Sequence, residues 1–227
     1  MKTFQKMLEQ REKSELIALI QQMLCLEPEL QWLLKAPLPM ASLAKISLDQ
    51  DLYRQQVRTA MELGNQLRTY KRHEIKRRLL AIKTFADTFV EQQQYAAALT
   101  IYDILVTEVI AHFGAYPDES IAFVVILQSC VDGLDSCLAG EEHYQPTRLQ
   151  AFHALFAIYR FFTDHGMDLD DDIASLLVEN ATTQEQATIA AWVQNALSAI
   201  GKTQMGGTSA NLHYQSLLAR LTKGGSK

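Results

Sequence analysis

Apolar residues recur at helical spacing along almost the whole chain. Ile75, Leu79, Ile82, Ala86 and Phe89, for example, follow steps of three or four and fall on one face of a helix. Proline, glycine or polar turn residues separate most such segments. The pattern predicts helices over 14–26, 28–34, 47–67, 70–92, 94–113, 118–140, 146–166, 171–180, 182–200 and 211–221.

Local capping signals agree with several of these starts. Ser47 with Gln50, and Thr182 with Glu185, have the spacing of a capping box, in which two side chains bond the free N–H groups of a first turn. Pro28 suits the first turn of the short segment that follows it, because a first-turn residue needs no N–H partner.

Composition supports the same fold class. The 227 residues include only ten glycines and five prolines, and 48% of the chain is hydrophobic, which favours a packed helical protein over a disordered one. We therefore expect an all-α fold of antiparallel helical hairpins, forming a tetratricopeptide-like α-solenoid or an irregular bundle. The expected organisation is an N-terminal helical hairpin at 1–35, a loop or linker at 36–47, a main helical domain at 48–200, and a flexible linker with a short terminal helix at 201–227.

One hairpin has a more particular pattern. Phe89, Tyr95, Ala98 and Tyr102 match the large, small and aromatic spacing of a tetratricopeptide-type helix pair, in which the small residue lets two helices approach. Glutamine stands in the turn where glycine is usual. No second copy follows at a period near 34, so the sequence predicts one repeat-like hairpin.

Several stretches resemble a known family. They are "KSELIALIQQMLCLEPELQWLL", "QYAAALTIYDILVTEVIAHF", "DGLDSCLAG" and "ALFAIYRFFTDHGMDLDDDIASLLVENATTQEQATIAAWVQNAL". In this order they resemble the helical, tetratricopeptide-like region that follows the SWIM-type zinc finger in bacterial proteins. The resemblance implies an interaction module. The chain has neither the Cys-x-Cys nor the Cys-x-His pair of that zinc finger, so no zinc ligand and no cofactor is carried over.

The strongest surface feature is a basic run at 68–83, with a local charge of +6 in a chain of net charge -5. Such a cluster can neutralise phosphates, contact a protein partner, pair with acidic residues of the same chain, or form a solvated face. The sequence leaves these alternatives open. The cations are Arg68, Lys71, Arg72, Lys76, Arg77, Arg78 and Lys83.

The acidic stretch "MDLDDDIASLLVEN" has the spacing of a calcium loop, with Asp168, Asp172 and Glu179 at positions one, five and twelve. The sixth position of such a loop turns sharply and favours glycine, but here it is the β-branched Ile173. We therefore predict a helix start, with Asp170, Asp171 and Asp172 at the cap and first turn, where carboxylates accept backbone N–H bonds.

No catalytic motif is evident. His73 and Glu74 lack the second histidine of a zinc protease, because position 77 is Arg77. The segment "RFFTDHG" and Trp192 carry aromatic residues that suit either the core or a groove for a partner helix. No secretory signal is present, and no stretch of roughly 18 residues is both apolar and uncharged.

We therefore expect a cytoplasmic, non-catalytic scaffold for protein–protein interaction, without cofactor, metal or membrane span. The alternative is a nucleic-acid-associated accessory module that contacts phosphates through 68–83.

Overall fold

The computed structural model describes residues 2–36, 48–67, 73–140, 145–167, 172–200 and 208–224. These residues are helical apart from short turns and include no strand, which confirms the all-α prediction. The chain divides into two compact units, Met1–Leu38 and Pro39–Lys227, and the division falls inside the linker expected at 36–47.

The first unit contains α1 (Lys2–Glu9), α2 (Lys13–Leu26) and η1 (Pro28–Leu34). At the start of α2, the Glu15 carboxylate accepts the N–H of Glu12 at 3.2 Å. η1 begins at a proline, as predicted, but it is a tighter 3-10 helix, which is usual for short pieces. α2 packs against η1.

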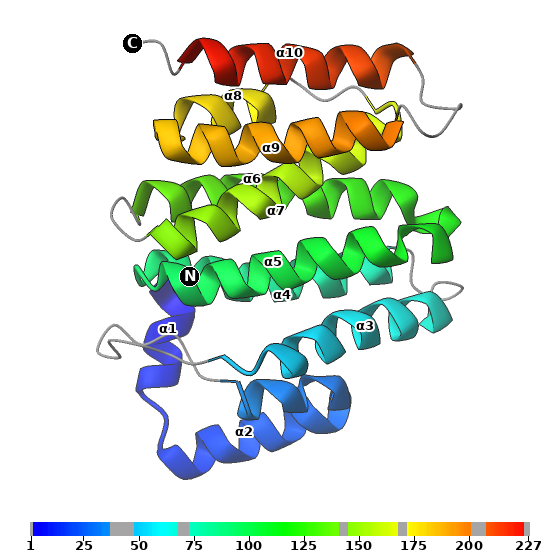
Figure 1. Cartoon of the computed structure of the whole chain (residues 1–227). Coiled ribbons are helices and arrows are strands. Elements are labelled where there is room, and N and C mark those ends of the chain that lie inside the picture. The colour runs from blue at the N-terminus through cyan, green and yellow to red at the C-terminus, as the bar shows by residue number, and fades with distance from the viewer. Residues whose placement is uncertain are drawn as a thin grey trace. The chain divides into compact units, whose positions relative to one another are not determined.

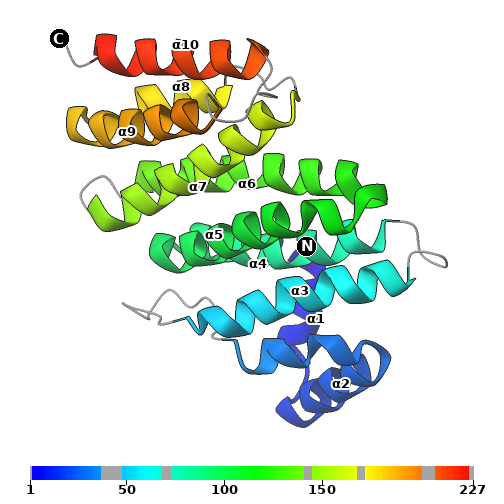
Figure 2. The same ribbon diagram turned by 45° about the vertical axis from the view of Figure 1, so that its right-hand side comes forward.

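The second unit stacks its helices in the order of the chain, and Figures 1 and 2 show this order from two directions. α5, α7 and α9 contact one another in sequence and form one row, and α4 and α6 contact each other behind it. The helices are α3 (Gln50–Leu67), α4 (Glu74–Glu91), α5 (Tyr95–His112), α6 (Ser120–Gly140), α7 (Gln145–Asp164), α8 (Asp172–Glu179), α9 (Thr183–Ile200) and α10 (Thr208–Gly224), with the short η2 (Phe113–Ala115) and η3 (Pro117–Glu119) between α5 and α6.

The core of the second unit forms where apolar faces meet. The whole predicted inner face of α4, from Ile75 to Phe89, is buried. α5 lies at the centre of the stack, in contact with α3, α4, α6 and α7. Its apolar residues surround the helix, as expected for a helix covered on several sides.

The turn between α4 and α5 explains how glutamine replaces glycine. Gln93 has φ 58°, in the left-handed region that glycine favours. The N–H of Gln94 reaches back to the carbonyl of Phe89 at 2.8 Å, and that of Gln93 reaches Val90 at 2.9 Å. These bonds close the end of α4 in the manner of a Schellman motif.

Two glycines let α6 approach α5. A Cβ atom on Gly133 would overlap the ring of Tyr102, and one on Gly140 would overlap the ring of Tyr95. The two pairs are each seven residues apart and run in opposite directions along the chain, so the helices are antiparallel and in register. The Tyr102 hydroxyl donates to Asp87 Oδ1 at 2.5 Å and so links α5 to α4 as well.

The four residues of the predicted hairpin motif are not equally buried. Phe89, Ala98 and Tyr102 are fully buried, whereas Tyr95 is half-buried against the exposed end of α6. The helix pair α6 and α7 stacks on α4 and α5 although its sequence lacks this motif. Stacking in the second unit thus extends beyond the one hairpin that the motif marks.

The starts of three helices differ from their predictions by three residues or more, and periodicity did not predict α1. α4 begins at Glu74 and not at residue 70. α3 begins at Gln50, and its cap is Asp49, whose Oδ1 accepts the N–H groups of Asp51 at 3.1 Å and Leu52 at 3.2 Å. The Ser47–Gln50 capping box is therefore wrong, because Gln50 cannot be the fourth residue of a helix that it starts. α10 begins at Thr208 and not at residue 211, and its buried residues are Tyr214, Leu217 and Leu221.

Two stretches of the described residues, Tyr95–Ala115 and Pro117–Gly140, are long and apolar enough to cross a membrane when one or two charged residues are allowed. About half of each is buried inside the second unit. Central helices of packed helical proteins have the same length and composition, so these stretches are weak indications of a membrane span.

Candidate functional site

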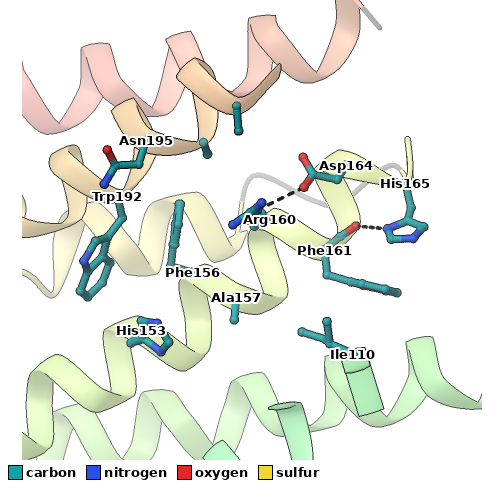
Figure 3. A pocket seen from close by; sticks show the side chains of 12 residues that line it. Ile110, His153, Phe156, Ala157, Arg160, Phe161, Asp164, His165, Trp192 and Asn195 are labelled. Carbon is teal, nitrogen blue, oxygen red and sulfur yellow. Dashed lines mark hydrogen bonds and ion pairs between the residues drawn. The ribbon is translucent and has the colours of Figure 1, made fainter. Parts of the chain in front are cut away.

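A groove of about 560 Å³ lies along the row formed by α5, α7 and α9. α7 supplies half of the lining residues, and Figure 3 shows α9 on one side of them and Ile110 of α5 on the other. The volume is within the range of ligand-binding clefts. The lining residues are Ile110, His153, Phe156, Ala157, Arg160, Phe161, Asp164, His165, Trp192, Asn195, Ala196 and Ala199.

Aromatic rings form one end of the groove. The indole of Trp192 stands edge-on to the ring of His153, with centroids 5.5 Å apart, and lies 5.9 Å from the ring of Phe156. Phe156 is almost fully buried, whereas His153 is exposed and Trp192 half-buried. These rings therefore present an apolar surface that reaches solvent at this end (Figure 3).

Aromatic contacts also hold the other end. His165 lies against Phe161 with ring centroids 4.3 Å apart, and its Nδ1 is 2.7 Å from the Phe161 carbonyl oxygen. Phe113 packs edge-on to Phe161 from the turn after α5. This end of α7 is therefore packed against the turn that follows α5.

The polar groups of the groove are arranged so that donors remain open. Asp164 Oδ1 accepts a hydrogen bond from the Tyr214 hydroxyl at 2.8 Å, and its Oδ2 accepts one from Arg160 Nε at 3.2 Å. Both oxygens of the carboxylate are thus occupied. Arg160 uses one of its five N–H donors in this pair, and its side chain is 53% exposed. The groove accordingly offers the remaining N–H donors of Arg160, although the charge of Arg160 is paired with that of Asp164.

The sequence predicted part of this site. Within "RFFTDHG", Arg160, Phe161, Asp164 and His165 line the groove, whereas Phe162 points into the core and is 1% exposed. Trp192 lines the same groove from α9, and its ring contacts are with His153 and Phe156. Asn195 gave no signal, because a lone exposed asparagine is common on any helix.

The basic run is not assembled as an open patch in the part that the structure describes. Arg77 and Arg78 both bind the buried carboxylate of Glu74, at 2.6 and 2.9 Å, and Lys83 binds Asp87 at 3.0 Å. Arg78 is 9% exposed and Lys83 18%. The predicted contacts Arg68, Lys71 and Arg72 lie outside the described residues, and Lys76 is half-buried on α4.

Three buried carboxylates are each held by arginine. Glu74 is bound as described above, and Glu108 accepts two bonds from Arg58, at 2.7 and 3.0 Å. Glu185 accepts two bonds from Arg148, at 2.9 and 3.3 Å. Because each negative charge is neutralised in place, these carboxylates are poorly suited to proton transfer. Glu108 and Glu185 join neighbouring helices, whereas both partners of Glu74 lie on its own helix.

The surroundings of the described cysteines also favour a structural role for their thiols over a reactive one. Burial raises the pKa of the Cys130 thiol to about 12, so the reactive thiolate is suppressed. Cys137 is buried on the same helix, with its Sγ 3.9 Å from the carbonyl oxygen of Tyr95. Burial, with a hydrogen bond to Asp87, also raises the pKa of Tyr102 well above its usual value.

The part of the acidic stretch that the structure describes belongs to α8. Asp172 and Glu179 are the first and last residues of α8, so their backbones lie about 10 Å apart along its axis. A helix of this length separates the fifth and twelfth positions of the supposed calcium loop. Asp168 and the cap residues Asp170 and Asp171 lie outside the described residues, and among those described no group of three or more metal-ligating side chains forms.

The second predicted capping box is present at the start of α9. The Thr182 N–H donates to Glu185 Oε2 at 2.8 Å, and the Glu185 N–H reaches Thr182 Oγ1 at 3.4 Å. The sequence did not reveal that the same carboxylate binds Arg148, which lies 37 residues earlier in the chain.

Comparison of the chain with family models, with curated proteins and with solved structures found no match.

Proposed function

We propose that this protein is a non-catalytic scaffold of tetratricopeptide-like architecture, and that the groove along α5, α7 and α9 binds a helix of a partner protein. The observation that carries the proposal is the groove itself, which is lined by the nearly buried Phe156, the half-buried Trp192 and the exposed Arg160. Aromatic and arginine side chains are the types that contribute most to binding at protein interfaces.

The chemistry of the groove favours a particular partner segment. Its apolar end between Phe156 and Trp192 suits a large aliphatic or aromatic side chain. The open donors of Arg160 suit a carboxylate, since both oxygens of Asp164 are already occupied. The expected ligand is thus an amphipathic helix that carries an apolar anchor and, one or two turns away, an aspartate or glutamate.

The packing within the second unit is consistent with this role. Rows of stacked helices expose extended faces that bind partners in helical-repeat proteins. The resemblance to the region that follows SWIM-type zinc fingers points to the same role, an interaction module without its own chemistry. We place the protein in the cytoplasm, where the buried thiols of Cys130 and Cys137 stay reduced.

Phosphate binding through 68–83 remains a prediction from the sequence alone. Arg77, Arg78 and Lys83 each have a carboxylate partner in the structure, which lowers the positive charge that they offer to a nucleic acid. Nothing in the described part of the basic run favours that alternative over the groove.

The proposal is tested by affinity capture from lysate of the source organism, followed by mass spectrometry. Trp192→Ala and Arg160→Glu should each remove the same protein from the captured set. Arg54→Glu is the matched control, because it disrupts a similar exposed pair, with Asp51 at 3.3 Å, on a helix that does not line the groove. A captured protein that is lost with the control, or retained by both groove variants, would contradict the proposal.

A further inference from the structure

The first unit carries most of the exposed apolar surface that the structure describes. Of the seven large hydrophobic side chains that are exposed, five lie between residues 7 and 34. On α2, Ile17, Ile20 and Met23 are 47%, 43% and 50% exposed. The run "LIALI" at 16–20 makes α2 apolar around much of its circumference, and helices of that kind are normally covered.

The three exposed apolar residues of α2 and two half-buried leucines beside them are arranged symmetrically about Ile20. Ile17 and Met23 lie three residues before and after it, and Leu16 and Leu24 lie four residues before and after it. Steps of three and four keep all five on one face of the helix. A two-fold axis through Ile20 therefore places each of these residues opposite an apolar residue of an identical helix.

The charged residues at the two ends of α2 follow the same symmetry. Lys13 lies seven residues before Ile20 and Glu27 lies seven residues after it, so each is two helical turns from the centre. In an antiparallel pair of α2 helices, Lys13 of one copy faces Glu27 of the other at both ends. A parallel pair would bring like charges together instead.

We propose that this face of α2, made by Leu16, Ile17, Ile20, Met23 and Leu24, binds the same face of a second copy of the chain in antiparallel orientation. A second copy is favoured over an unrelated partner because both the apolar residues and the terminal charges are complementary to themselves under a two-fold axis, as an isologous interface requires. A single pair of short helices buries less than the roughly 1,200 Å² of a standard interface, so the dimer dissociates on dilution.

The first test is sedimentation velocity over a range of protein concentrations. The natural chain should shift from monomer to dimer as concentration rises. Ile20→Glu places two carboxylates against each other on the axis and should weaken association on the order of 100-fold. Ile121→Glu is the matched control, because Ile121 is 79% exposed on α6 and lies outside the proposed face.

The proposal is overturned if the natural chain stays monomeric at every concentration, or if Ile20→Glu associates as strongly as the natural chain. Circular dichroism of each variant shows whether helix content is kept. Loss of association with the Ile121→Glu control as well would also overturn it, because the contact would then lie elsewhere.

Cross-linking tests the orientation. A short bismaleimide is applied to variants in which Cys25 is replaced by serine, since Cys130 and Cys137 are buried. Ile20→Cys should cross-link to itself, and a mixture of Ile17→Cys and Met23→Cys should give the mixed dimer. Efficient self-cross-linking of Ile17→Cys alone would indicate a parallel pair and overturn the antiparallel arrangement.

Discussion

Arg148 on α7 holds Glu185 on α9 through two hydrogen bonds, Nε to Oε1 at 2.9 Å and Nη2 to Oε2 at 3.3 Å. Both side chains are almost completely buried, at 8% and 3% exposed. The same guanidinium donates to the carbonyl oxygens of Leu138, at 3.0 Å, and Asn180, at 2.7 Å. One arginine therefore joins the end of α6 and the end of α8 to the start of α9, and so sets the position of one wall of the groove.

Breaking this pair should strongly destabilise the protein. Glu185→Leu leaves the buried charge of Arg148 without its counter-ion and should lower the free energy of unfolding by about 3–5 kcal/mol. Adding Arg148→Met removes that charge and should restore part of the loss. Urea unfolding of both variants measures the effect, and a double variant less stable than the single one would contradict the assigned pairing.

Acid should weaken the same contact. Burial by itself would raise the pKa of the Glu185 carboxyl, but hydrogen bonds from Arg148 and Thr182 and the charge of Arg148 outweigh burial and lower it below its usual 4.5. A carboxyl group whose pKa is lower in the folded than in the unfolded protein stabilises the fold at pH values above the unfolded pKa. That stabilisation is lost as the pH falls through the folded pKa.

The free energy of unfolding should therefore decrease as the pH falls below about 4.5. The decrease should be smaller in the Arg148→Met, Glu185→Leu double variant than in the natural protein. Unfolding measured in urea at a series of pH values tests this, and equal pH dependence in the two proteins would exclude a contribution from Glu185.

Gly133 should be required for the contact between α5 and α6. Gly133→Ala introduces a Cβ into the ring of Tyr102, so it should destabilise the protein by about 1–3 kcal/mol, although alanine is normally the better helix former. Gly114→Ala is the control, since its Cβ meets no atom within 4 Å. Thermal unfolding distinguishes them, and equal melting temperatures would show that the ring of Tyr102 moves aside freely.

Gln93→Gly should stabilise the protein by about 1 kcal/mol, because glycine adopts the left-handed conformation at φ 58° without steric cost. Gln92→Gly, one residue earlier at φ -91°, gains nothing and should be neutral or destabilising. Chemical unfolding of the two variants separates the effect of conformation from that of losing a glutamine. Equal effects would contradict this account of the turn.

Periodicity predicted the helices well because the α4 face from Ile75 to Phe89 meets one core along its whole length. It failed where a competing local interaction decides the boundary. Asp49 displaced Ser47 as the cap of α3 because its carboxylate reaches two backbone N–H groups. α10 starts at Thr208, before the predicted position, because Thr208, Ser209 and Ala210 join the helix without adding a large apolar residue that periodicity could register.

The candidate site was harder to predict from the sequence, because contacts between distant residues also decide it. The aromatic residues of α7 indicated either core or groove, and the structure shows Phe161 and Phe162 both buried, at 4% and 1% exposed, with Phe161 also lining the groove. The pairing of Asp164 with Tyr214 spans 50 residues, so no local pattern predicts that its carboxylate is occupied.

The groove is tested most directly by site-specific photo-cross-linking. A photoreactive amino acid replaces Asn195, which lines the groove and is exposed, or Gln128, which is equally exposed on α6 away from it. After illumination in lysate, the position-195 protein should form a discrete adduct with one partner, and Arg160→Glu should abolish that adduct. Adducts of the same identity from both positions, or none from position 195, would contradict a partner-binding groove along α5, α7 and α9.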